Sequence, residues 1–514
     1  YSTTFNWQSQ PEFAINSPTY NVGNTIQNSR TIQINPTLNF TNLYNKFRFM
    51  RKLNNSPDDA GSLGKTMLGL LTSVKSVTGA YTRTEGTFLP GYLPQSNLMG
   101  EDLTYNSPGI GFLLGSQADI RQRALANGWL STDTLQNQLY STSLTENLDL
   151  KDVLEPFRDL RVEQLAKHQQ ERNFQSNFKF VPANNRFEEL SPITSGDYSV
   201  SFLSIGTAFS KPYGIDNKSG VFQQFLQNRA VISQRQGAIN PNSTGQSGGY
   251  ADGYSASSQD VLVPSFLAAY TGKDPHSISL SELPNIPIPN WQITYNGLSR
   301  LPLFSDIFDS FDLQHGYRST YSVNSYSSLI RYQEVNGASY NRDVNTDFLP
   351  RYQFTQITLF EQFVPLIGMN VRFRNSVTAN FEYRKSRAIS LSLLNSQLAQ
   401  QNENILVFGL GYRTTHFRFP FGWFSGLKLN NDINFKLDVA LRDNKTLIYR
   451  ADVASAEISS GAKNITMRPA IDYVISQRFN MSIFYDSNIT RPYTSQTFNT
   501  SVTNFGVNLR LLLQ

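Results

Sequence analysis

The feature that most constrains the fold is a strict alternation of side chains in the C-terminal half. Between residues 369 and 383 the odd positions are apolar or aromatic except Asn375, and every even position from 370 to 384 is polar. Successive side chains of a β-strand point to opposite faces, so the pattern predicts strand with one apolar and one polar face. The odd-face pattern resumes at residues 389–393 after a polar run.

The length of this stretch does not suit a small soluble sandwich. Fully extended, residues 369–393 would span roughly 80 Å at about 3.3 Å each. Strands usually have about 5–6 residues, and membrane-crossing strands need only about 9–11. The stretch is either a pair of strands or one strand that continues well beyond a bilayer. We expect it to rise from a short turn at residues 364–368, with the run 384–387 standing above the membrane.

Composition favours a membrane β-barrel over a soluble β protein. Charged residues are 16% of the 514 residues and aromatic residues 13%, whereas soluble domains have roughly 25% charged residues. No run of about 20 apolar residues is present, which excludes transmembrane helices. We predict an all-β fold: a segment of a very large antiparallel transmembrane β-barrel with long loops and a small α-helical insertion. A large soluble solenoid or lectin is the alternative.

The chain divides into three parts. Residues 1–210 are predicted to be barrel strands with a long Gly/Pro-rich loop at 85–145, and residues 289–514 are predicted to be barrel strands to the C-terminus. Residues 211–288 interrupt them with helical patterns. Because residues 1–7 already alternate as if inside a strand, we expect a piece of a longer protein.

The middle part is interpreted as a helical insertion or cap. Ser219 is placed to N-cap one helix, and a second helix near residues 260–270 is predicted to stop at Gly272. A Gly/Ser/Asn-rich link joins the two helices. The simplest role for such an insertion in a β chain is packing, and we expect it to fill or cover a lumen.

The pattern after residue 352 predicts seven strands with alternately short and longer connections. They are 352–363, 369–394, 404–419, 427–450, 457–475, 479–491 and 497–513. Short turns on one side and long loops on the other are typical of outer-membrane barrels, and on this count the last strand ends on the periplasmic side. Upstream the count is inconsistent, so one crossing is missing or misassigned near residues 197–209.

The alternation also assigns faces, with apolar side chains toward lipid and polar side chains toward a lumen. The predicted lipid-facing residues are Val371, Phe373, Val377, Phe381, Phe435, Leu437 and Val439. The predicted lumen-facing residues are Arg372, Arg374, Thr378, Asn434 and Lys436.

No arrangement of catalytic or metal-binding residues stands out, so we predict neither an enzyme nor a bound cofactor or metal. The four histidines, His168, His276, His315 and His416, are scattered without a second ligand at metal spacing. Cysteine is absent, which excludes disulfides and thiolate metal sites. A net charge of +5 over this length does not indicate a nucleic-acid partner.

Several motifs resemble the C-terminal part of the SprA/Sov family, the giant outer-membrane translocon of the Bacteroidota type IX secretion system. They include Leu154-Glu-Pro-Phe-Arg-Asp-Leu160 and Phe381-Glu-Tyr-Arg-Lys-Ser-Arg387, with further segments at 42–53, 87–92, 260–272, 289–298, 315–323 and 504–510. They occur in the family's order and cover nearly the whole chain. The resemblance implies a multi-pass barrel in the cell outer membrane that passes folded cargo from the periplasm to the cell surface.

The same resemblance implies partners. They are the remaining segments of the same barrel, a smaller outer-membrane barrel of the PorV type, a periplasmic plug protein, and secreted cargo with a C-terminal targeting domain, gliding adhesins among them. The family supplies no catalytic residues to carry over. Two alternatives stay open, a nutrient receptor of the TonB-dependent type and a surface adhesion β protein. The first would need a plug domain before the barrel, and the second soluble β-repeats; neither is evident in the sequence.

Overall fold

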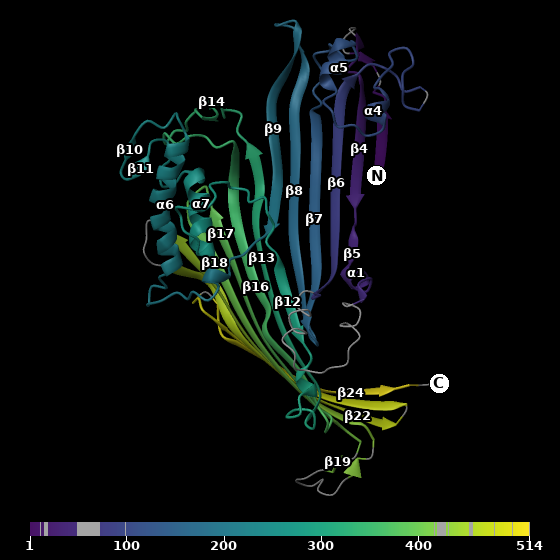
Figure 1. Ribbon diagram of the computed structural model, residues 1–514, viewed down its shortest axis with the longest axis vertical. Coiled ribbons are helices and arrows are strands. Elements are labelled where there is room, and N and C mark those ends of the chain that lie inside the picture. Colours follow the sequence, from purple (N-terminus) through teal and green to yellow (C-terminus); the bar gives the residue numbers. More distant parts are fainter. Residues whose placement is uncertain are drawn as a thin grey trace.

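The chain folds around one large antiparallel sheet, so the all-β prediction is confirmed. The structure, a computed structural model, describes residues 1–10, 12–14, 19–48, 72–97, 99–415, 417–418, 428–429, 431–451, 456–476, 478–495 and 497–512. Figure 1 shows a tall, curved sheet with α6 (Gly220–Ile239) and α7 (Gln259–Thr271) beside its middle strands. The short helices α4 (Ile110–Leu113) and α5 (Arg121–Ala126) lie near the N-terminal strands. None of the helices in the described part of the chain is both long and apolar enough to cross a membrane.

Spatial order in the sheet follows the chain almost throughout. The order is β1 (Ser2–Gln8), β4 (Asn24–Ile34), β6 (Val74–Tyr92), β7 (Tyr140–Phe157), β8 (Leu160–Val181), β9 (Arg186–Ser201) with β12 (Asn290–Tyr295), β13 (Phe308–Ser328), β16 (Tyr352–Phe373), β17 (Val377–Ser392), β18 (Gln397–Thr414), β21 (Ile433–Arg450), β22 (Ala456–Ser476), β23 (Phe479–Pro492) and β24 (Thr500–Leu511). The longest, β8 and β16, have 22 residues each, about twice what a bilayer crossing requires.

Smaller elements occupy the connections. They are α1 (Phe40–Tyr44), the 3₁₀ turns η1 (Ile205–Thr207) and η2 (Leu298–Arg300), β5 (Thr37–Asn39), which pairs with β6, and the two-stranded ladders β2 (Phe13–Ala14) with β3 (Thr19–Tyr20), β10 (Gln246–Ser247) with β11 (Tyr250–Ala251), β14 (Glu334–Val335) with β15 (Ala338–Ser339), and β19 (Phe417–Arg418) with β20 (Lys428–Leu429).

The alternating stretch is a pair of strands, so the single strand over 369–394 and its turn at 364–368 are wrong. β16 continues through 364–368 with only an irregularity in its pairing. The chain reverses instead in a three-residue turn that ends at Ser376, whose φ is 64°. Such a turn leaves residues of equal parity opposite each other, as Val371 and Ala379 are. The apolar alternation therefore passes through the turn unbroken.

β9 and β12 together form one strand of the wall, which the helical insertion interrupts. β8 and β13 each pair with β12 along their first part and with β9 along the rest. The chain leaves this line after Ser201 and returns at Asn290, where the N–H of Ile288 donates to the Ser201 carbonyl at 3.0 Å. This composite strand is the missing crossing near 197–209. With it, strand directions are consistent from β7 to β24.

Short and long connections occur at both ends of the sheet, so the predicted separation by length is incomplete. The two-residue link 158–159, the turn after β16 and the short link between β22 and β23 lie at one end, where β24 also ends, and the 12-residue connection 296–307 lies there too. The connections 93–139 and 329–351 lie at the other end, which they share with the four-residue links 182–185 and 393–396. The predicted loop 85–145 is therefore shorter than expected. The longer connection predicted at 395–403 is also wrong, since β18 begins at Gln397.

Other predicted elements agree with the structure. The strands expected at 457–475 and 479–491 are β22 and β23 to within one residue at each end. Ser219 caps α6, with its hydroxyl accepting from the Phe222 N–H, and α7 ends at Gly272 in the left-handed conformation. The short connection predicted at 420–426 and residues 49–53 of the resemblance segment 42–53 lie outside the described residues.

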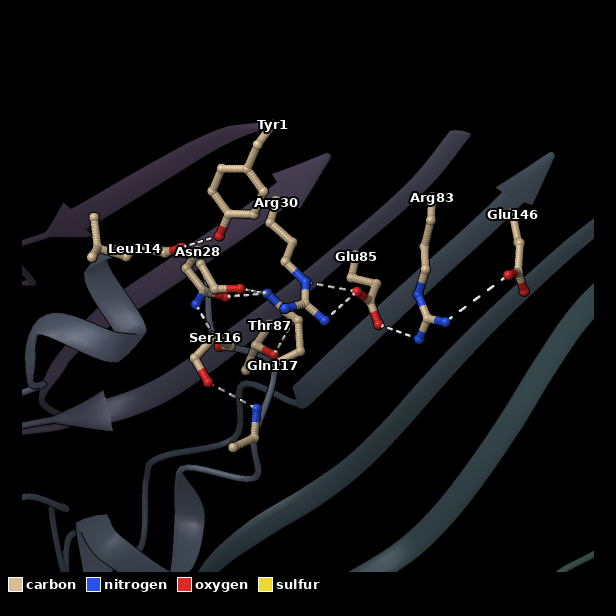
Figure 2. Close-up of polar contacts among 12 residues, drawn as sticks. Tyr1, Asn28, Arg30, Arg83, Glu85, Thr87, Leu114, Ser116, Gln117 and Glu146 are labelled. Carbon is tan, nitrogen blue, oxygen red and sulfur yellow. Dashed lines mark hydrogen bonds and ion pairs between the residues drawn. The ribbon is translucent and has the colours of Figure 1, made fainter. Parts of the chain in front are cut away.

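Residues 93–139 pack on the same face of the sheet as the helical insertion. Their core includes Leu89 and Tyr140, and cross-strand register places these on the face that carries the insertion's contacts. Figure 2 shows polar contacts that hold this loop to the sheet. The Asn28 side chain donates to the Ser116 carbonyl at 2.9 Å, and Thr87 donates to Gln117 at 2.8 Å.

Candidate functional site

The wall formed by β17, β18 and β21 has the most regular register in the sheet. These strands pair without irregularity over their shared length, so a face can be followed from one end to the other. On β17 the odd residues from Val377 to Leu391 lie on one face, which we call the apolar face. The even residues from Thr378 to Ser392 lie on the opposite one, the polar face.

A continuous apolar band crosses the lower part of the apolar face. One cross-strand row of this band consists of Met369, Phe381, Phe408, Val439 and Met467. The rows on either side of it are also apolar. On β21 the band extends from residue 433 to residue 441, roughly 26 Å at about 3.3 Å per residue, which matches the band of about 25 Å in transmembrane barrels.

The band is open to its surroundings. Phe408 is 38% exposed and Leu410 39%, and on the edge strand Phe505 is 71% exposed. Soluble monomers rarely expose a contiguous apolar patch larger than a few hundred Å². A band that crosses all the strands from β13 to β24 therefore requires an apolar medium against it.

The polar face carries cross-strand charge pairs at the same height. Lys436 Nζ lies 2.8 Å from Asp472 Oδ2, and Arg468 Nε lies 3.2 Å from Asp486 Oδ1. Three more arginines on this face are paired with carboxylates: Arg442 with Glu403 across strands, Arg384 with Glu382 on the same strand, and Arg413 with Asp432 just before β21. Exposed pairs of this kind contribute only about 0–1 kcal/mol each, so their main effect is a hydrated wall of low net charge.

Two glycines on β18 form a shallow recess in the polar face. Gly409 and Gly411 line a groove of about 360 Å³ together with Asn380, Thr378 and Lys436. A Cβ at Gly409 would lie 1.8 Å from the Asn380 amide oxygen, so glycine lets the neighbouring polar side chains lean across the strand. The groove presents amide, hydroxyl and ammonium groups, which can hydrogen-bond to water or to polar groups of a ligand.

The structure separates the predicted residues into two sets. Those on the apolar face are Val371, Phe373, Val377, Phe381, Phe435, Leu437 and Val439, and those on the polar face are Arg372, Thr378, Asn434 and Lys436. Arg374 lies in the turn after β16 and is not part of the wall. That lipid covers the first set and a lumen the second remains a prediction.

The insertion packs on the apolar face, above the band. Phe222, Phe266 and Tyr270 of its helices belong to one core with Ile389 and Tyr449 of the wall. The polar face on the other side carries the charge pairs. The helices thus cover the face opposite to the one predicted to line a lumen, so the two expectations, a polar lumen and an insertion that fills or covers it, do not both hold for this wall.

A buried ion pair fastens the insertion to the wall, and sequence reasoning missed it. Arg387 Nη2 lies 2.8 Å from Glu361 Oε2, and both side chains are only 3% exposed. Tyr317 and Ser204 donate to Glu361 at 2.7 Å each, and Arg387 donates to the Thr207 carbonyl at 2.7 Å. Arg387 thus lies beneath the insertion, which the expectation of a run 384–387 standing above the membrane did not include. The alternation offered one signal, since Arg387 occupies an odd, apolar-face position.

A pair of neighbouring carboxyl groups lies within the insertion. Asp260 at the start of α7 and Glu282 are both half-buried, and the Gln259 amide donates to Glu282 Oε1 at 2.8 Å. Burial raises the pKa of Asp260 to about 6, and burial together with the neighbouring Asp260 raises the pKa of Glu282 well above its ordinary value.

In the described part of the chain, no group of His, Asp and Glu is arranged to hold a metal ion; His416 lies outside that part.

Comparisons with known proteins do not assign a family. No family model and no curated protein matches the chain. Among solved structures, the RagAB peptide transporter aligns over 93% of this chain and 47% of its own, at 7% identity and a TM-score of 0.26. The ferric yersiniabactin uptake receptor FyuA from Yersinia pestis aligns over 92% of this chain and 53% of its own, at 6% identity and a TM-score of 0.21. The chain spans about half the length of these structures, and likenesses this weak carry no functional assignment.

Proposed function

We propose that the chain forms part of the wall of a protein-conducting barrel in the outer membrane, the role implied by the resemblance to the SprA/Sov family. One observation supports this most: a wall with an apolar band of membrane height on one face and hydrated charge pairs on the other. Lipid would cover the band, and secreted protein would pass along the polar face. The proposal assigns no catalysis and no cofactor to the chain.

The open edges of the sheet support a barrel completed by other segments. Within the described residues, β1 pairs only with β4 and β24 only with β23. Unpaired strand edges are an aggregation risk that barrels remove by closure. A wall that is fourteen strands wide and still open, with β9 and β12 counted as one strand and β5 as the continuation of β4, implies a wide pore, which folded cargo needs. A smaller PorV-type barrel, a periplasmic plug and cargo with a C-terminal targeting domain are the partners that this proposal includes.

Deletion of the gene followed by proteomics of the culture fluid tests the role. We expect proteins that carry the type IX targeting domain to disappear from the fluid and accumulate in the periplasm. Reintroducing the intact gene should restore secretion. Unchanged secretion of these proteins after deletion would exclude the translocon role and leave a nutrient receptor or an adhesin.

Site-specific photocrosslinking tests the assignment of the two faces. A photoreactive residue at Asn380 should crosslink to cargo, and one at the adjacent Phe381 should crosslink to lipid. The two positions occupy the same height on β17, so they are matched controls for each other. Cargo crosslinks from Phe381 but not from Asn380 would reverse the assignment of lumen and lipid.

A further inference from the structure

A cross-strand row rich in charged residues lies directly above the apolar band. The last fully apolar row contains Tyr383, Leu406, Leu441, Ile465 and Ile489. The next row on the same face is formed by Lys385, Asn404, Asp443, Lys463 and Arg491, and Lys445 follows one row higher. The change from apolar to cationic thus occurs between adjacent rows.

These cations are not paired with any carboxylate of the described residues, and the three lysines contact aromatic rings or an amide oxygen instead. Among the described residues, Lys385, Lys445, Lys463 and Arg491 form no ion pair, whereas the five arginine and lysine residues of the polar face described above are all paired. The one carboxylate in the row, Asp443, accepts a hydrogen bond from the Tyr493 hydroxyl at 2.7 Å. The four cations and Asp443 together therefore carry a net charge of +3.

The first segment of the insertion crosses the wall from the cationic row to rows above it. Residues 208–218, which we call the interface loop, begin beside Phe363 and Lys385, both of which contact the Phe209 ring. They end beside β21 and β22, where Asn217 accepts from Lys445 at 3.0 Å and the Asp216 carbonyl accepts from the Ala456 N–H at 2.9 Å.

The interface loop exposes three large apolar side chains and contains two lysines. Phe209 is 53% exposed, Tyr213 56% and Ile215 100%. Lys211 and Lys218 lie between and beyond them in the sequence. Aromatic rings and lysines at the boundary of an apolar band are the composition that suits a membrane–water interface, where rings rest at the level of the headgroups and lysines reach phosphate.

We propose that the cationic row and the interface loop form a binding site for the phosphate groups of anionic membrane lipids, with Ile215, Phe209 and Tyr213 inserted among the headgroups. The proposal rests on the proposed membrane function of the wall. Charge complementarity and continuity with the band identify a lipid surface as the occupant. The site would fix the depth at which the wall rests in the membrane and hold the insertion at its surface.

Lipid titration of the detergent-solubilised protein tests the charge. We expect tighter binding of fluorescent phosphatidylglycerol than of phosphatidylcholine with the same acyl chains. The triple variant Lys385→Gln, Lys445→Gln, Lys463→Gln should weaken phosphatidylglycerol binding at least roughly tenfold, from the contribution expected of each cation near an anionic surface. Arg384→Gln, Arg442→Gln, Arg468→Gln removes three charges from the same strands on the polar face and should retain it.

Three results would overturn the proposal. They are equal affinity for the two lipids, equal losses in both triple variants, and displacement of the lipid by equimolar inorganic phosphate, which would indicate a site for free phosphate. If the first triple variant fails to fold, Lys385→Arg, Lys445→Arg, Lys463→Arg keeps the test available, because it should preserve binding. Circular dichroism checks folding in each case.

Spin labelling in nanodiscs separates this proposal from the membrane function itself. The chain contains no cysteine, so single variants Ile215→Cys and Phe381→Cys each label one site. We expect the Ile215 label at headgroup depth and the Phe381 label deep in lipid. A deep Phe381 label with a fully aqueous Ile215 label would refute the interface loop alone. Aqueous labels at both positions would also refute the membrane wall.

Discussion

The buried pair of Arg387 and Glu361 gives the sharpest energetic prediction. Both side chains are 3% exposed, and Glu361 also accepts from Tyr317 and Ser204. Arg387→Met would leave the carboxylate buried without its cation. Removing one partner of a buried pair costs about 3–5 kcal/mol, so we expect a loss of this size. It should fall on the docking of the insertion, since Arg387 also holds the Thr207 carbonyl.

A double variant separates the charge from the packing. In Arg387→Met with Glu361→Gln, no charge is buried, and the amide oxygen still accepts from Tyr317 and Ser204. Replacing both charged partners is often near neutral, so most of the lost stability should return. Arg384→Met is the control, because this exposed arginine on the polar face should cost no more than about 1 kcal/mol.

Urea unfolding in detergent and hydrogen exchange of α6 and α7 measure these effects. Arg387→Met should lower the unfolding midpoint and speed exchange in both helices, while β22 and β23 exchange as before. A loss below about 1 kcal/mol with unchanged exchange would contradict a desolvated pair that fastens the insertion.

The remaining predictions concern the band, pH and one close backbone contact. Phe381→Arg should cost roughly 2–4 kcal/mol in folding into vesicles if it lies near mid-bilayer, and Asn380→Arg on the polar face close to none. The raised pKa values of Asp260 and Glu282 mean that the folded insertion binds more protons than the unfolded chain. The free energy of unfolding of the insertion should therefore be highest below about pH 4 and decline as the pH rises through 6. Glu282→Gln should flatten this decline, and a stability that increases over this range would contradict the raised pKa values. A Cβ at Gly196 would lie 1.9 Å from the Glu171 carbonyl oxygen, so Gly196→Ala should cost about 1–3 kcal/mol in thermal unfolding; an unchanged melting temperature would show that the backbone yields without strain.

The faces of the wall could be predicted from the sequence, while the turn between its strands could not. Alternation reports only the parity of a residue, and the three-residue turn ending at Ser376 conserves parity. The pattern is therefore the same for one long strand and for the hairpin of β16 and β17. Only the length of residues 369–393 pointed to two strands, because ordinary strands are much shorter.

The composite strand was harder to find because its halves are separated in the sequence. β12 has six residues and β9 ends without a turn signal at Ser201. Each half alone resembles a weak strand next to an irregular region. Only the pairing of both with β8 and β13 shows that they continue one line.

Side-chain contacts between residues far apart in the sequence also could not be predicted from the alternation of polar and apolar residues. Arg387 and Glu361 are charged residues at odd, apolar-face positions, which marks them as exceptions to the alternation but does not show that they are buried or paired with each other. Their burial depends on where residues 204–207 return to the sheet. The cationic row likewise becomes visible only when five strands are aligned by register.

The composite strand has an evolutionary consequence. Because the chain leaves the wall after Ser201 and rejoins the same line at Asn290, residues 202–289 are a graft that alters neither the number nor the direction of the strands that follow. Such a segment can lengthen, be exchanged or be lost while every downstream residue keeps its side of the sheet. Such changes leave the strand count and the facing of the wall untouched, and only the wall residues beneath the insertion, such as Arg387 and Glu361, must change with it.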